Sequence, residues 1–342
     1  MEHIDLHMHS LYSDGTDTPD ELVRRAKEAG LGMIALTDHN TLDGIPDFRE
    51  ACARYHMAGI DGVELSTGWE RNPALDSTSR EPVPATGTTG LEPVPGVNSS
   101  ENLSAEVPVH SGNPISPKPG FPEKEPPEIH ILGYFPKDSD LSAPSFKALR
   151  KVVEDYHLLK LRHNEAIVQR IADAAPGADL VSVAGFHAFA RTQSDSGNYN
   201  RVHIARYLVQ TGTASSVDDA FGRFIGKDCP YYVPKRNVTM QEAIAAIHAA
   251  RGTAVVAHVG EYHFDRERLR AFFDDSMAWG IDGYELLHPH NTPETAREIL
   301  AFAERFRRTT GRVLLLTAGS DYHGRNKKNR QGLPWHPDYA WD

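Results

Sequence analysis

Histidine, aspartate and glutamate residues accompany every strand-length apolar segment of this 342-residue chain, mostly at the segment's end. The segments, each with its polar residues, are Ile4–His9 with His7, His9 and Asp14, Met33–His39 with Asp38 and His39, Ile60–Ser66 with Glu64, Ile129–Phe135 with His130, Thr253–Val259 with His258, Ile281–His288 with His288 and His290, and Val313–His323 with Asp321 and His323. The chain has 18 histidines, so about one His-x-His pair is expected by chance and a lone pair is a weak zinc-type signal. The recurrence of these residue types in all seven segments is the stronger signal. His288 and His290 match the one pair expected by chance and are not among the expected metal ligands.

Ring nitrogens and carboxylates without cysteine suit Mn, Fe or Zn and argue against an iron–sulfur cluster. If the segment ends meet, their carboxylates repel one another unless cations neutralise them. The pattern therefore predicts a cluster of divalent metal ions.

Helical patterns separate the apolar segments and would bring their ends together. One begins at the capping box Thr18-Pro19-Asp20-Glu21 and stops at Gly30, a second runs from Thr239 to Gly252, and a third runs from Thr292 to Gly311. An apolar segment follows each helix at once, and this alternation predicts a parallel sheet or barrel. In a β/α barrel the active site lies where the strands end.

Two insertions are expected within this barrel. Residues 69–128 contain 12 Pro, 5 Gly, 7 Ser and 4 Thr and repeat the motif EPVP, so they have little apolar surface to stabilise a fold. We interpret them as a long irregular insertion, either a disordered segment or a lid. Residues 141–234 are rich in helical pattern and predict an inserted helical subdomain. The barrel would then consist of residues 1–68, 129–140 and 235–342.

Composition excludes several classes of protein. The formal net charge of −11 argues against duplex DNA and anionic membranes as partners, because both require clustered positive charge. Cys52 and Cys229 cannot form a multi-disulfide scaffold, and the N-terminal residues lack the features of a signal peptide. We expect a cytoplasmic protein.

Six motifs occur in a characteristic order along the chain. They are His7-Met-His9-Ser with Asp14-Gly15, Leu36-Thr-Asp38-His39-Asn40-Thr41, Gly62-Val-Glu64, His130-Ile-Leu-Gly133-Tyr134, Ala257-His258, and Gly319-Ser-Asp321-Tyr-His323-Gly324. In these motifs the chain resembles the polymerase and histidinol phosphatase (PHP) family of metal-dependent phosphoesterases.

This resemblance implies a distorted seven-stranded (β/α) barrel and a site for three divalent ions. By motif, His7, His9, Glu64 and Asp321 would hold one ion, Glu64 with His130 and His258 a second, and Asp14, His39 and His323 the third. A hydroxide bridging two of the ions would attack the phosphorus of a phosphate ester.

The substrate class also comes from the resemblance. The segment from Ser196 to Ala205 and the later Tyr232-Val-Pro234 resemble the branch that acts on nucleoside 3′,5′-bisphosphates or on the 5′ ends of single-stranded RNA. Arg201 offers a planar fork for a phosphate, and His203 would bind phosphate or protonate the leaving oxygen. His288 would line the substrate pocket.

Other readings remain open at this point. The chain could hydrolyse a sugar or histidinol-type phosphate, cleave C–N bonds as amidohydrolases do, or serve as a non-catalytic metal or phosphate sensor. Asp38 would either orient His39 or cap the turn at Asn40-Thr41.

Overall fold

The computed structural model describes residues 3–71, 126–193 and 199–325. Residues 72–125, which make up most of the predicted 69–128 insertion, lie outside the described residues. The interpretation of that insertion as a disordered segment or a lid therefore stays a prediction.

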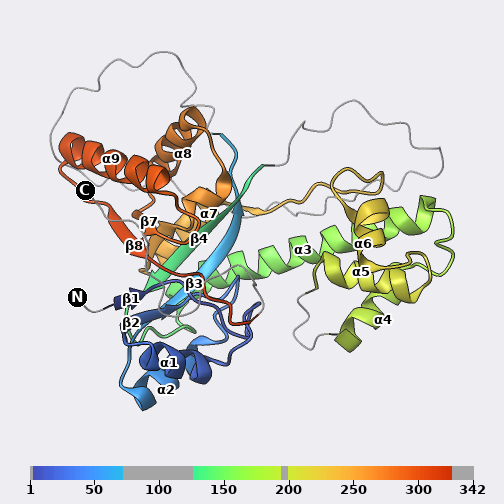
Figure 1. Cartoon of the computed structure of the whole chain (residues 1–342), viewed down its shortest axis with the longest axis horizontal. Helices are drawn as coiled ribbons and strands as arrows, with labels where there is room; N and C mark the ends of the chain where they lie inside the picture. The colour runs from blue at the N-terminus through green and yellow to red at the C-terminus, as the bar shows by residue number, and fades with distance from the viewer. Residues whose placement is uncertain (1–2, 72–125, 194–198, 326–342) are drawn as a thin grey trace. The chain divides into compact units, whose positions relative to one another are not determined.

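The strands form one mixed sheet in the spatial order β1-β2-β3-β4-β6-β7-β8, with β5 paired to β3 (Figure 1). Their bounds are β1 His3–Asp5, β2 Leu31–Leu36, β3 Ala58–Gly68, β4 Glu128–Phe135, β5 Val238–Thr239, β6 Thr253–Val256, β7 Gly283–Leu287 and β8 Leu315–Ala318. Beyond β8 and β1 the sheet closes on itself, because Leu6 donates to the Ala318 carbonyl at 2.9 Å and His9 to the Tyr322 carbonyl at 2.8 Å. The predicted seven-stranded barrel is confirmed, since seven strands follow one another around the sheet. The eighth strand, β5, has only two residues and was too short to predict.

Strand β4 corrects the expectation of an all-parallel sheet, since it runs antiparallel to both β3 and β6. His130 lies at the start of β4 and not at its end. The reversed direction brings this start to the edge where the parallel strands finish. His130 therefore joins the other strand-end residues for a reason that the sequence pattern did not contain.

Helices cover the sheet and form a second group between β4 and β5. Their bounds are α1 Pro19–Glu28, α2 Ile45–Tyr55, α3 Lys147–Ala174, α4 Val183–Gln193, α5 Arg201–Gln210, α6 Val217–Ala220, α7 Met240–Ala249, α8 Arg266–Ala278 and α9 Pro293–Thr310, with short helical turns at η2 Pro144–Phe146, η3 Phe221–Ile225 and η4 Val259–Tyr262. The predicted capping box at Thr18 is present, and the second predicted helix also begins with a capping box, at Thr239. The third predicted helix begins after the Thr292 cap and ends before Gly311, whose φ of 71° only glycine adopts readily.

Helix α3 belongs to two hydrophobic cores. Leu149 and Val152 in its first half pack with β3, β4 and α7, whereas Ile167 and Ile171 in its second half pack with α4, α5 and α6. Figure 1 shows α3 running from the sheet to the group formed by α4, α5 and α6. A continuous helix thus connects the helical group to the barrel, and the predicted boundary at residue 141 stays a prediction. Within the described residues no helix combines the length and apolar character that crossing a bilayer requires.

Candidate metal centre

Glu64, in the middle of β3, is the hub of the site and is fully buried. Its Oε1 lies 2.9 Å from His130 Nδ1 and 2.9 Å from His258 Nε2. Its Oε2 lies 3.2 Å from Nε2 of both His7 and His9, and 3.0 Å from His39 Nδ1. Each carboxylate oxygen thus faces a different group of imidazoles, as expected for a carboxylate that bridges two cations.

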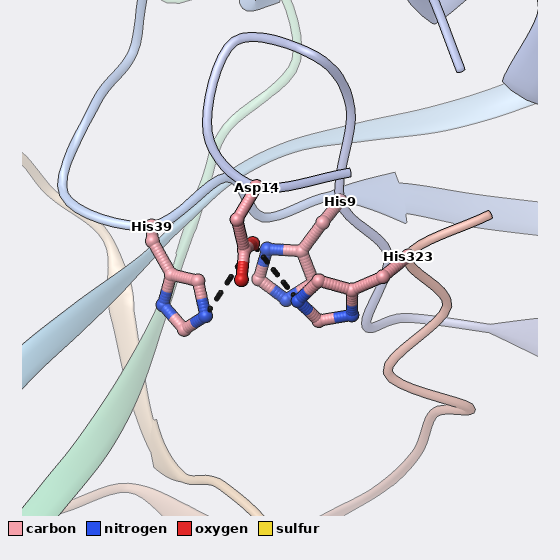
Figure 2. Close-up of side chains that lie close together, drawn as sticks. All are labelled: His9, Asp14, His39 and His323. Carbon is pink, nitrogen blue, oxygen red and sulfur yellow. Dashed lines mark ion pairs between the residues drawn. The ribbon is translucent and has the colours of Figure 1, made fainter. Parts of the chain in front are cut away.

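Asp321 and Asp14 complete the acidic part of the cluster. Asp321 Oδ1 lies 3.1 Å from His9 Nε2 and 3.5 Å from His7 Nε2. Asp14 Oδ1 lies 2.9 Å from His323 Nε2 and 3.8 Å from His39 Nε2. Figure 2 shows the Asp14 carboxylate pointing between His39 on one side and His9 and His323 on the other. All nine predicted ligands therefore converge on one edge of the barrel.

The donor atoms fit cations better than they fit one another. Nε2 of His7, Nε2 of His9 and Oε2 of Glu64 are buried, and although each nitrogen lies 3.2 Å from the oxygen, none of the three atoms has a well-oriented hydrogen bond among the described residues. Unsatisfied buried polar atoms are costly and rare in native proteins. Potential metal-ligating atoms of His7, His9, Glu64 and Asp321 all lie within 4.8 Å of one another, and so do those of His9, Asp14, His39 and His323. Divalent cations among these groups would satisfy them.

The electrostatic environment differs between the histidines of the cluster. Burial lowers the pKa of His39 to about 3 and, helped by the neighbouring His323 and His39, lowers the pKa of His9 well below its ordinary value. Burial opposes ionisation of Glu64, but His39, His7 and His130 outweigh it and lower the Glu64 pKa. Against burial, Glu64 and Glu285 raise the pKa of His7 to about 10, and Glu64 and Glu128 raise that of His130 to about 9. Metal binds neutral imidazoles and ionised carboxylates, so cations entering the site would displace protons from His7 and His130.

The backbone is strained at this edge of the barrel. His258 has a φ of 27° and Asp321 a φ of 54°, and Asn40, directly after His39, has a φ of 51°. Residues other than glycine adopt such backbone conformations at an energetic cost, and this strain is often found at functional sites. These conformations occur at the turns that carry His39, His258 and Asp321.

Two buried carboxylates that the sequence pattern did not single out support the cluster. Glu285 in β7 lies 3.1 Å from His7 Nδ1. Asp5 at the end of β1 accepts the Ser320 N–H at 2.9 Å and joins the segments that carry His7 and Asp321. An acidic residue inside an otherwise apolar segment was the signal that could have found both.

Asp38 adopts neither of its two expected roles. It accepts the N–H of Ser10 at 2.7 Å, the Ser10 hydroxyl at 2.7 Å and the Ser13 hydroxyl at 2.6 Å. These bonds hold the loop that carries Asp14.

The predicted substrate residues lie in two different environments. His288 is buried, with its ring centroid 5.3 Å from that of His258 and its Nε2 3.8 Å from Asp321 Oδ2. Arg201 and His203 lie in the first turn of α5. There His203 Nδ1 lies 3.1 Å from the backbone nitrogen of the N-cap residue Asn200 and 2.8 Å from its side-chain Oδ1. The assignment of these three residues to substrate stays a prediction.

Two lysines add positive charge beside the cluster. The ammonium groups of Lys160 and Lys235 lie 5.8 Å and 5.6 Å from the centre of the Tyr156 ring. Lys235 also pairs with Glu128 at 2.7 Å, and Glu128 lies 3.4 Å from His130 Nε2. Burial and the charge of Lys235 lower the pKa of Lys160 to about 8, while Glu128 and Asp14 act in the opposite direction.

Comparison with known proteins identifies the family. The family model of the PHP domain matches residues 5–175, half of the chain. The chain belongs to the PHP family. The expectation of a metal-dependent phosphoric ester hydrolase with a mixed α/β, barrel-like fold is thereby confirmed.

Relatives of known name extend over almost the whole PHP chain. A 5′-3′ exoribonuclease of Haemophilus influenzae is 28% identical over 93% of this chain and 89% of its own length. A 3′,5′-nucleoside bisphosphate phosphatase of Chromobacterium violaceum is 24% identical over 98% of this chain and 93% of its own length. A solved structure assigned as a metal-dependent phosphoesterase, from Bifidobacterium adolescentis, is 25% identical with a TM-score of 0.59 and covers 97% of this chain and 91% of that one.

Proposed function

We propose that this enzyme hydrolyses phosphate esters of nucleotides, with nucleoside 3′,5′-bisphosphates or short 5′-phosphorylated oligonucleotides as substrates. The main support is the arrangement around Glu64, whose two oxygens face separate groups of imidazoles, as a centre with several metal ions for ester hydrolysis would require. Both named relatives described above act on molecules of this class. The substrates are single-stranded and small, in keeping with the acidic net charge of −11.

Nine residues would hold three divalent ions of Mn, Fe or Zn. His7, His9, Glu64 and Asp321 would bind the first ion, Glu64, His130 and His258 the second, and Asp14, His39 and His323 the third. Three carboxylates against three divalent ions leave a net charge of about +3, which favours a phosphate dianion. When bound, the ions supply positive charge for the phosphoryl oxygens and lower the pKa of water.

The chain's own cations would hold the rest of the substrate. Burial, Arg206 and Lys160, in that order, lower the pKa of the His203 imidazole, against the backbone hydrogen bond to Asn200. A lowered His203 pKa keeps the ring neutral at pH 7. His203 therefore suits hydrogen-bond donation to a phosphate better than the protonation of a leaving group.

Arg201, the first residue of α5, would complete this side of the site. Arg201 and Lys160 together would bind the phosphate that is not being hydrolysed, so the second phosphate would distinguish a bisphosphate from a simple ester.

The test combines metal analysis with a comparison of two substrates. Elemental analysis of the purified protein should give close to three ions per chain, and a nucleoside 3′,5′-bisphosphate should be hydrolysed with a higher kcat/KM than an aryl phosphate. Arg201→Ala should lower kcat/KM for the bisphosphate by roughly 10- to 100-fold, the range for a hydrogen bond to a charged group. It should change the aryl phosphate much less.

Other outcomes separate the remaining functions. Full metal occupancy without turnover of any ester would favour the sensor, and hydrolysis of amides would favour the amidohydrolase. Preference for a sugar or histidinol phosphate, with no effect of Arg201→Ala on it, would contradict the nucleotide assignment.

A further inference from the structure

Glu285 contacts two of the proposed metal ligands from the side opposite Glu64. It is fully buried in β7. Its Oε1 and Oε2 lie 3.1 Å and 3.4 Å from Nδ1 of His7, and Oε2 also accepts the backbone N–H of His258 at 2.8 Å. The other ring nitrogen of His7, Nε2, faces Glu64 and Asp321 at 3.2 Å and 3.5 Å.

An ionised carboxylate can only accept hydrogen bonds, so Glu285 requires a proton on Nδ1 of His7. The lone pair of the neutral ring is then on Nε2, the nitrogen that faces the other ligands. A carboxylate behind a metal-binding histidine fixes the tautomer and the ring orientation in this way and raises ligand basicity. We propose that Glu285 is a positioning residue that holds His7 and the His258 backbone in their metal-binding geometry. This inference rests on the proposed metal centre.

The neighbourhood of Glu285 leaves little freedom for another arrangement. A Cβ added at Gly319 would lie 2.3 Å from the His7 Cβ and 2.5 Å from Glu285 Oε1. Only glycine at this position lets the segment after β8 pass so close to both side chains. The close packing holds Glu285 and His7 against each other in one geometry.

A second arrangement of the same side chains is a direct competitor. Donors of His7, Glu285 and His288 also lie within 4.8 Å of one another and could hold an ion themselves. In that case Nδ1 of His7 would carry a metal and not a proton. The two arrangements differ in the protonation of one atom and in the number of ions bound, and both can be measured.

The experiment uses Zn²⁺-loaded protein and Glu285→Gln, which keeps the size of the side chain. The NH₂ group of the glutamine replaces one carboxylate oxygen, so it would face a donor, either Nδ1–H of His7 or the backbone N–H of His258, and that donor would lose its nearest acceptor. Competition with a chelator should show a 10- to 100-fold loss of Zn²⁺ affinity, with an unchanged number of ions at saturation. Asp275→Asn is the matched control, because Asp275 is an equally buried carboxylate that accepts Trp69 Nε1 at 3.0 Å. Its Zn²⁺ affinity should equal that of the parent.

A second readout needs no variant. In ¹⁵N spectra of the Zn²⁺-loaded parent, His7 should show a proton on Nδ1. A metal-bound Nδ1, or the loss of one ion at saturation in Glu285→Gln, would instead make Glu285 a ligand and overturn the positioning role. Unchanged affinity in Glu285→Gln would also overturn it. A parent without bound metal would refute the metal centre and this inference together, whereas a metal-loaded parent inactive on nucleotides would refute only the substrate.

Discussion

Lys160 is a lysine whose charge changes close to neutral pH. Its pKa of about 8 reflects burial and the nearby Lys235. Its ammonium group is therefore charged at pH 7 and largely neutral at pH 9. A bound phosphate would stabilise the charged form, so binding through Lys160 should weaken as the pH rises through 8.

We predict that KM for a nucleoside 3′,5′-bisphosphate, taken relative to KM for an aryl phosphate, rises between pH 7 and pH 9. The ratio removes effects of pH on the metal centre that both substrates share. Lys160→Arg should abolish the rise because the guanidinium stays charged, and Lys160→Ala should raise KM for the bisphosphate at pH 7 by about 10-fold or more. Steady-state kinetics across this range provide the measurement.

Lys151 is the control for Lys160. It lies on the same helix, its side chain is 70% exposed, and it pairs with Asp155. Lys151→Ala should leave the KM ratio and its pH profile unchanged. A flat profile in the parent would remove Lys160 from the phosphate site.

Individual ligands could be predicted from the sequence because imidazoles and carboxylates recur beside strand-length segments. The contacts of the residues that support them could not, even where an acidic residue inside an apolar segment was visible. Glu285 lies inside a predicted strand, and Lys160 lies inside a helix of ordinary composition, so nothing in the local pattern shows what either side chain faces. Their contacts arise between segments that are far apart in the chain.

At the scale of elements, the loop between β1 and α1 is held by a neighbouring strand end. Asp38, just beyond β2, accepts three hydrogen bonds from Ser10 and Ser13. Asp14 follows directly and faces His323 and His39. The position of Asp14 therefore depends on a carboxylate that contacts no proposed ion.

We predict that Asp38→Asn lowers the metal content from three ions to two. The asparagine presents an NH₂ group to one of the donors of Ser10 or Ser13, so a buried donor loses its partner at a cost of about 1–3 kcal/mol. The loop should then release Asp14 and with it the ion shared with His39 and His323. Elemental analysis and thermal melting together measure both effects.

Asp61→Asn separates loss of stability from loss of metal. Asp61 is also buried and accepts Arg49 Nε at 3.0 Å and Nη2 at 2.7 Å. This variant should melt at a lower temperature and keep three ions. Equal metal contents in Asp38→Asn and the parent would contradict the role of the loop.

Helix boundaries were predictable because Thr18, Thr239 and Thr292 are caps that act within a few residues of chain. Strand direction was not. The reversal of β4 depends on pairing with β3 over eight residue pairs, from Asp61 with Phe135 to Gly68 with Glu128. Such pairing joins segments separated by a long stretch of sequence, and local periodicity does not show it.

At the scale of the whole molecule, this same pairing brings the two ends of the 69–128 stretch together. Gly68 pairs with Glu128, and the N–H of Trp69 donates to the Pro127 carbonyl at 3.1 Å. The two strands could therefore be joined by a short connection without moving either of them. The entropy cost of closing a loop rises with the logarithm of its length. A long connection therefore lowers the free energy of unfolding unless it forms contacts of its own.

We predict that deletion of residues 75–122 leaves a folded, metal-loaded enzyme with higher stability. The connection between Gly68 and Glu128 would shorten from about 60 to about 11 residues, which lowers the closure cost by about 1.5 kcal/mol. For a protein of this size Tm should rise by roughly 2–4 °C. Thermal melting and elemental analysis test this, and a lower Tm or the loss of cooperative melting would show that the deleted residues contribute to folding. If the deleted protein folds but its KM for the bisphosphate changes several-fold while KM for an aryl phosphate does not, the segment acts as a lid over the larger substrate.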